Sequence, residues 1–368
     1  MAAAPVATGA FTSWNGPGRV QGIDLARGLA VLGMFAAHLL WIDPFQPADP
    51  ATWFDVANGR SSILFATLAG VSLALATGAE RPFDGARMRR ARVAVAVRAV
   101  IVWLVGVALI STGVPLVVIL PAYAILFLLA IPLLTGSVRA LWWLAAGLAV
   151  TTPWLVPLWN AMPLWWTVEG EVLADAIGWH YPFPLWLAFL AAGLAVGRSH
   201  LLRIEVQVRL LVGGALVAAG GYGAAALFAW PGDTYFAAVW SAEAHSSGLG
   251  EAIGSGSFAV AVIAASLLIC RTPLTWVLLP VRAVGTMPLT AYVGQVVAWA
   301  IWAQLALGDT GDIVGMRALA PFGPFALVTL AGCTIWAVWV GRGPLERVVA
   351  AVTGAVAARA VGSRRGPR

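Results

Sequence analysis

Charged residues are scarce in this chain. Only 10% of its 368 residues are Asp, Glu, Lys or Arg, whereas 61% are hydrophobic and the mean hydropathy is +0.87. A soluble globular domain carries about 25% charged residues, so the composition excludes that class. It indicates instead a polytopic helical membrane protein.

Cysteine is also rare, and the common short motifs of soluble enzymes are absent. The two cysteines, Cys270 and Cys333, lie in apolar runs, which argues against a disulfide framework. No CxxC pair, HExxH sequence, phosphate-binding glycine loop or internal repeat occurs. The histidines and acids lack ligand-like spacing, so we expect no metal site. Residues 1–20 have no charged start followed by an apolar core, and we expect a short tail there, not a cleaved signal peptide.

Ten apolar runs are long enough to cross a hydrocarbon core about 30 Å thick. They fall near 22–42, 60–78, 93–112, 115–134, 139–159, 183–202, 206–230, 254–270, 284–306 and 321–341. We therefore expect an all-α transmembrane bundle of about ten spans within residues 21–342, flanked by a tail at 1–20 and an Arg-rich tail at 343–368. Gly193 and Gly197 are typical of close helix packing.

All 22 basic residues are arginines, and their positions orient the predicted bundle. Most lie in the loop before the third span, in the sixth connection and in the C-terminal tail: Arg81, Arg87, Arg89, Arg90, Arg92, Arg198, Arg203, Arg209, Arg342, Arg347, Arg359, Arg364, Arg365 and Arg368. The opposite loops hold most of the acids and only Arg60 and Arg317 as basic residues. Because cytoplasmic loops collect positive charge, we expect both termini in the cytoplasm. The net charge of +6 then reflects topology and contact with anionic lipid, and nucleic acid is not an expected partner.

Arg27 and His38 are the most informative polar residues because they stand eleven residues apart in one apolar run. Eleven residues are three helical turns within about 20°, so both side chains are expected on one face, about 16 Å apart along the axis. Asp24 extends this face. Ionisable residues inside a spanning helix commonly mark a functional path. A helix-end Arg–Asp pair with a hydrogen-bonded His is the structural alternative.

Candidate acid–base residues gather on the predicted outer side. His38 lies at the outer end of the first span, and Glu243-Ala-His245-Ser lies in an outer loop. A His beside a carboxylate can act as a general base, since its ordinary pKa is near 6.5. For the loop residues, a solvated surface is the alternative interpretation.

Other polar residues are candidates for substrate binding. Arg60 opens the second span near His38 and is positioned for an anionic intermediate, although it can equally snorkel to the interface. Tyr292 and Gln295 are polar residues at helical spacing in the ninth span, where facing lipid would be costly. Tyr123 in the fourth span is a weaker candidate, because tyrosine is tolerated at packing positions.

Several segments together resemble one family. They are Arg19-Val-Gln-Gly-Ile-Asp-Leu-Ala-Arg27-Gly, Ile119-Leu-Pro-Ala-Tyr123, Gly285-Thr-Met-Pro-Leu-Thr-Ala-Tyr292-Val-Gly-Gln295 and Arg342-Gly-Pro-Leu-Glu346. Over nearly the whole chain they resemble the YeiB-like bacterial membrane family. That family is more distantly similar to heparan-α-glucosaminide N-acetyltransferase and to the O-acyltransferases of bacterial surface polysaccharides. The chain departs from the former in having no His between residues 42 and 60.

The resemblance implies a transmembrane acyltransferase in the bacterial inner membrane. In the O-acyltransferases an Arg near the inner end of the first span precedes a catalytic His by eleven residues, and Arg27 and His38 match that spacing. The implied co-substrate is acyl-CoA, acetyl-CoA in the first instance, and the acceptor is a hydroxyl or amine of an envelope glycan or lipid-linked molecule. His38 would be general base or acyl carrier, with Arg27 guiding the donor and Tyr292 or Gln295 stabilising the oxyanion. Membrane lipid is a further expected partner, and a homodimer is an open possibility.

A secondary transporter is the alternative from a different functional class. Intramembrane ionisable residues and polar spans also suit a carrier of a small solute or lipid precursor. Carriers are commonly built from two related halves, and no repeat is visible here. The ionisable residues also concentrate in one helix, which favours the enzyme.

Overall fold

The computed structural model of the chain describes residues 15–16, 18–232 and 234–362. The predicted all-α fold is confirmed, since these residues form helices and contain no strand. Each of the ten predicted apolar runs contains an α-helix. These helices are α2 (Gln21–Leu39), α3 (Arg60–Ala76), α4 (Gly85–Ile110), α5 (Leu120–Ala130), α6 (Val138–Thr151), α9 (Phe183–Arg198), α10 (Ile204–Leu227), α12 (Gly256–Ile269), α15 (Pro288–Leu307) and α17 (Phe322–Trp339).

Shorter helices connect these elements. They are η1 (Pro50–Ala57), η2 (Ile131–Thr135), η3 (Thr152–Trp154), α7 (Val156–Asn160), η4 (Pro163–Trp166), α8 (Val168–Ile177), α11 (Tyr235–Trp240), η5 (Gly250–Ser255), α13 (Leu274–Val277), α14 (Leu279–Thr286) and α16 (Ile313–Ala318). The predicted C-terminal tail contains α18 (Pro344–Gly362), which packs against α4 and α15. Residues 1–14, 17 and 363–368 of the predicted tails lie outside the described residues.

Within the described part of the chain, seven segments are long and apolar enough to cross a membrane: α2, η1 with α3, α4, α10, η5 with α12, α15 and α17. The helices of the other predicted spans, α5 with η2, α6 and α9, are shorter. The helix of the fifth predicted span, 139–159, is short because Pro153 and Pro157 interrupt this run. Proline cannot donate the backbone hydrogen bond of a continuing helix. The predicted ninth span is shortened too, because a break at Met287 separates α14 from α15.

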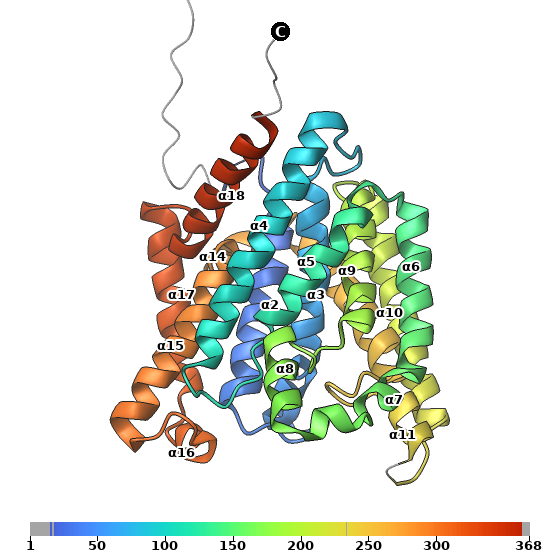
Figure 1. Cartoon of the computed structure of the whole chain (residues 1–368), viewed down its shortest axis with the longest axis vertical. Helices are drawn as coiled ribbons and strands as arrows, with labels where there is room; N and C mark the ends of the chain where they lie inside the picture. Colours follow the sequence, from blue (N-terminus) through green and yellow to red (C-terminus); the bar gives the residue numbers. More distant parts are fainter. Residues whose placement is uncertain (1–14, 17, 233, 363–368) are drawn as a thin grey trace, which may run out of the picture.

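The arginines divide the molecule into two ends. The start of α4, the junction of α9 and α10, and α18 lie at one end, which we call the arginine end, whereas α8, α11 and α16 lie at the other (Figure 1). Arg87, Arg89, Arg90 and Arg92, predicted in the loop before the third span, lie instead in the first turns of α4. Helix α18 packs against α4.

Helix α2 lies at the centre of the bundle, with α3, α12, α14, α15 and α17 packed around it. Glycine makes the closest of these contacts, because a Cβ at Gly285 on α14 would overlap the carbonyl of Asp24, and one at Gly28 would overlap that of Val281. Glycines similarly join α3 and α9, where a Cβ at Gly193 would overlap the Thr67 carbonyl. The interpretation of Gly193 as a packing residue is confirmed.

Replacing Gly193 by Val should separate α3 from α9, since the added side chain meets backbone that cannot move aside. We expect a loss of about 1–3 kcal/mol or more of stability, measured as a lower unfolding temperature in detergent. Gly147→Val on α6 is the matched control, because a Cβ there meets no atom within 4 Å. Equal unfolding temperatures for the two variants would contradict this packing.

Candidate active site

Arg27 and His38 lie on the same continuous helix, α2, and line two different cavities. At 1.5 Å per residue their positions are about 16 Å apart along the axis. The cavity at Arg27, which we call the inner cavity, opens near the arginine end and has a volume of about 430 Å³. The cavity at His38, the outer cavity, lies toward the other end and has a volume of about 240 Å³.

The two cavities meet. Met34, Ile119 and Tyr292 line both of them. These three residues come from α2, from the start of α5 and from α15. These three residues, which we call the junction, therefore form the wall that the two cavities share.

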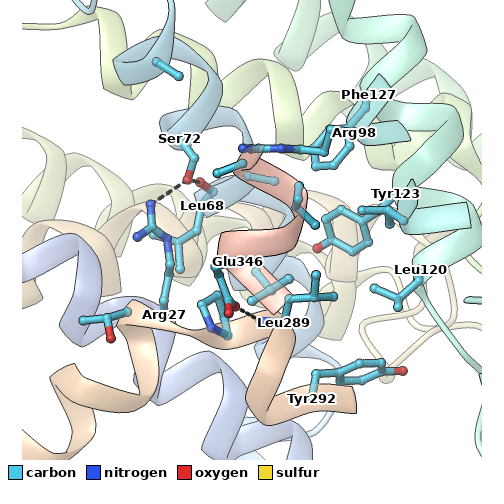
Figure 2. Close-up of a pocket in the computed structure, with 18 of the residues that line it drawn as sticks. Arg27, Leu68, Ser72, Arg98, Leu120, Tyr123, Phe127, Leu289, Tyr292 and Glu346 are labelled. Carbon is cyan, nitrogen blue, oxygen red and sulfur yellow. Dashed lines mark hydrogen bonds between the residues drawn. The ribbon is translucent and has the colours of Figure 1, made fainter. Parts of the chain in front are cut away.

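A buried ion network fixes Arg27. The Asp24 carboxylate, 2% exposed, accepts hydrogen bonds from Arg19 Nε at 2.5 Å and from Arg27 Nη1 at 3.1 Å. Arg27 Nη2 also donates to Ser72 Oγ on α3 at 2.7 Å (Figure 2). Asp24 lines neither cavity, so the structure assigns it to positioning the two guanidiniums and not to direct contact with a ligand.

Two further arginines in the inner cavity have no counterion. Arg98 on α4 and Arg342 before α18 line it, and their guanidiniums have no hydrogen-bond or ion-pair partner among the described residues. The Glu346 carboxylate also lines the cavity but makes no ion pair with either arginine, since it accepts from the backbone N–H groups of Leu289 and Thr290 at the start of α15. Four arginines, Arg19, Arg27, Arg98 and Arg342, line the cavity against this one carboxylate. Figure 2 shows Arg98 and Glu346 on different sides of the cavity. The cavity is thus electropositive and suited to a polyanion.

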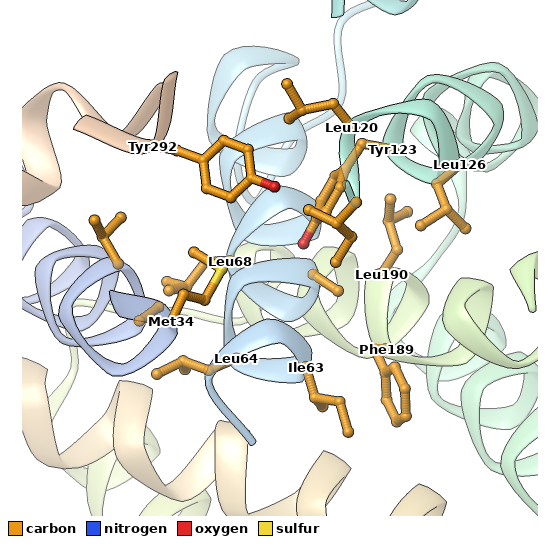
Figure 3. Packing of buried hydrophobic residues seen from close by; sticks show 14 of the residues in the cluster. Met34, Ile63, Leu64, Leu68, Leu120, Tyr123, Leu126, Phe189, Leu190 and Tyr292 are labelled. Carbon is orange, nitrogen blue, oxygen red and sulfur yellow. The ribbon is translucent and has the colours of Figure 1, made fainter. Parts of the chain in front are cut away.

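Tyr123 and Tyr292 supply hydroxyls deep in the inner cavity. The Tyr123 hydroxyl is buried and has no hydrogen-bond partner among the described residues, and its side chain points into the cavity (Figure 2). Figure 3 shows both tyrosines among the apolar side chains of the core, including Met34 and Leu68. The walls around the junction are therefore largely apolar.

His38 is held through one of its ring nitrogens. Nδ1 lies 3.4 Å from Oε1 and 3.2 Å from Nε2 of the Gln295 amide. His38 Nε2 has no hydrogen-bond partner among the residues that the structure describes. When Nδ1 carries the proton and donates it to Oε1, Nε2 is free to accept a proton from a substrate. Arg317 holds the end of the helix beside it by donating to the His38 and Ala37 carbonyls at 3.1 and 3.3 Å.

His245 joins His38 in the outer cavity, although not with the predicted partner. Glu243 is exposed and lines neither cavity. The buried Glu251 carboxylate instead accepts from the backbone N–H groups of His245 and Ser247, each at 2.7 Å. These bonds hold both residues in the left-handed region, at φ of 62° and 59°. His245 lines the outer cavity but is itself exposed to solvent.

Arg60, for which anion binding and snorkelling were both open, is not among the residues that line the outer cavity. Its Nε donates to the Tyr222 hydroxyl at 2.7 Å and its Nη1 to the Asp55 carbonyl at 3.1 Å. Its sequence neighbours Gly59 and Ser61 line the cavity instead. The reason is helical geometry, because consecutive residues at the start of α3 point in different directions.

Two family models match the chain. Residues 19–220 match the model described as "Heparan-alpha-glucosaminide N-acetyltransferase, catalytic". The chain belongs to this family. Residues 196–355 match a second model, "Protein of unknown function (DUF418)". No curated protein and no solved structure matches.

The family confirms the resemblance drawn from the sequence motifs. Together with the apolar helices it makes the chain a multi-pass membrane protein with a general N-acetyltransferase-like function. The heparan-α-glucosaminide N-acetyltransferase match contains Arg27, His38 and Arg98, and the second match contains Tyr292 and Arg342. Among the described residues no group of three His, Cys, Asp or Glu side chains can hold a metal ion.

The sequence did not single out four residues that line or support the two cavities. Arg98 was indistinguishable from arginines explained by topology, and Arg342 was visible only within the Arg342-Gly-Pro-Leu-Glu346 segment. Arg317 could have been noticed in the sequence, because it is one of only two basic residues in the predicted outer loops. Nothing in the sequence favoured Glu251, since Glu243 stands closer to His245.

Replacing Asp24 by Asn should destabilise this transferase-like bundle, because Arg19 and Arg27 would lose their shared counterion. Removing one partner of a buried ion pair costs about 3–5 kcal/mol, so we expect a clearly lower unfolding temperature. Asp84→Asn is the control, because Asp84 is exposed and makes no side-chain hydrogen bond. A variant as stable as this control would show that Asp24 is not needed to hold the arginines.

Proposed function

We propose that the chain transfers an acyl group, acetyl in the first instance, from cytoplasmic acyl-CoA to a hydroxyl or amine of an envelope glycan or lipid-linked acceptor. One observation carries the proposal: a cavity with unpaired guanidiniums meets, at Tyr292, a cavity that holds His38. The family match supports the transferase over a transporter. The proposed setting is the bacterial inner membrane, with the arginine end and both termini in the cytoplasm, as the arginine distribution favours.

The inner cavity suits the donor. CoA carries several phosphate groups, and guanidiniums bind phosphate through charge-assisted hydrogen bonds. In this proposal Arg98 and Arg342 hold the phosphates at the cytoplasmic mouth. The slender pantetheine arm then follows α2 from Arg27 toward the junction, so that the thioester reaches His38.

His38 acts in this scheme as the general base. Its Nε2 takes the proton from the acceptor hydroxyl or amine while the acceptor oxygen or nitrogen bonds to the thioester carbonyl carbon. The Tyr292 hydroxyl donates to the developing oxyanion. Collapse of the tetrahedral intermediate breaks the carbon–sulfur bond, and the CoA thiolate takes up the proton from His38. Direct acyl transfer through His38 is the other form of the same reaction.

The outer cavity suits the acceptor. Its lining includes His245, Asn58 and the hydroxyls of Ser61 and Ser62. Such groups donate and accept hydrogen bonds and match the hydroxyl and amine groups of a sugar. The His245 imidazole adds ring nitrogens that can donate or accept a hydrogen bond there.

His38→Ala should abolish transfer, because it removes the proposed base. We expect kcat to fall about 100-fold or more, with acetyl-CoA binding retained. The measurement is CoA thiol release from acetyl-CoA by the purified protein in nanodiscs, with glucosamine as the probe amine and the acetylated product followed by mass spectrometry. His180→Ala is the control, because His180 pairs with Asp175 on an exposed surface. Release that is equal in the wild type and the folded His38 variant would overturn the proposed role.

The double variant Arg98→Gln, Arg342→Gln should weaken donor binding. Each hydrogen bond to a charged group contributes about 1.5–3 kcal/mol, so the KM for acetyl-CoA should rise roughly tenfold or more while kcat changes little. Arg359→Gln on α18 is the control, because this exposed arginine lies outside the cavity. An unchanged KM would place the CoA phosphates elsewhere.

A further inference from the structure

A second apolar cavity lies away from His38, on the side of the bundle formed by α6 and α10 (Figure 1). Helix α6 packs on α9, and α10 packs on α12. A groove of about 440 Å³ remains between α6 and α10, with α9 and α12 as its floor. Small residues create the space, among them Ala146, Ala192, Gly213 and Gly256.

The groove has a charged end. Arg209 and Leu210 line it and also line a polar hollow at the arginine end, where Arg81, Arg198 and the Glu80–His200 pair are found. Arg198 is committed to the Thr77 hydroxyl and nearby carbonyls. The exposed guanidiniums of Arg81 and Arg209 have no hydrogen-bond or ion-pair partner among the described residues.

The lining of the groove favours a hydrocarbon chain, because apart from Arg209 and Ser257 it consists of apolar residues and glycines. From Arg209 to Val217 the lining of α10 spans about 12 Å at 1.5 Å per residue. An acyl chain laid along this stretch contacts apolar groups on both sides and ends at Arg209.

We propose that this groove and the adjoining hollow form a binding site for an anionic glycerophospholipid. An acyl chain lies between α6 and α10, against the alanines and glycines, and the headgroup phosphate accepts hydrogen bonds from Arg81 and Arg209. Basic pockets between spanning helices on the cytoplasmic side bind anionic headgroups in this way. The site is independent of the reaction proposed at His38, because it shares no residue with either of those cavities.

The test compares phosphatidylglycerol with phosphatidylcholine of identical acyl chains, added to the delipidated full chain in detergent. The unfolding temperature and the bound mass by native mass spectrometry are measured. We expect phosphatidylglycerol to bind and to raise the unfolding temperature more than phosphatidylcholine. Arg81→Gln, Arg209→Gln should remove this difference, and Arg359→Gln should keep it.

Gly213→Leu should fill the groove and reduce stabilisation by both lipids. A Cβ at Gly213 meets no atom within 4 Å, so the variant should fold, and Gly220→Leu on the same helix is a matched control with equal freedom outside the groove. Equal stabilisation by the two lipids in the wild type would overturn the anionic site. If both lipids stabilise the Gly213 and Gly220 variants equally, the acyl chain does not bind in this groove. A dimer that lacks bound lipid and is lost only in Gly213→Leu would assign the groove to a second copy of the chain.

Discussion

The close packing of α2 is the constraint on which the rest of the structure depends. This helix brings Asp24, Arg27 and His38 into an apolar bundle, where an unpaired charge is costly. Glycines at the contacts with α12 and α14 let the neighbouring backbones approach α2 closely. As one continuous helix, α2 therefore fixes the separation of Arg27 and His38. Helices α3, α14 and α15, which supply other groups of the cavities, pack around it.

The fold followed from the sequence because its signals are local. Apolar runs locate helices wherever they are long, and the ten predicted runs each contain one. The predicted spans were wrong in length where a proline ends the helix within an apolar run, as at Pro153. An average of hydropathy does not detect such a break. Arg27 and His38 were likewise accessible, since helical periodicity alone places them on one face.

Long-range side-chain pairing was not accessible from the sequence. Arg60 and Ser61 are neighbours, yet only Ser61 lines the outer cavity, because one residue of rotation decides which way a side chain points. Glu251 replaces Glu243 beside His245 because the chain between them turns through two left-handed residues. Such geometry depends on packing against distant helices, and no spacing rule describes it.

The position of α18 has a consequence for the order in which the protein folds during synthesis. Arg342 and Glu346 line the inner cavity, and Glu346 also anchors the start of α15, the helix that carries Tyr292 and Gln295. Contacts between α18 and α4 join segments separated by most of the chain, and such non-local contacts form late. During synthesis on the ribosome the helix with His38 is finished long before this wall exists. The nascent protein therefore stays without a closed inner cavity until α18 has docked on α4.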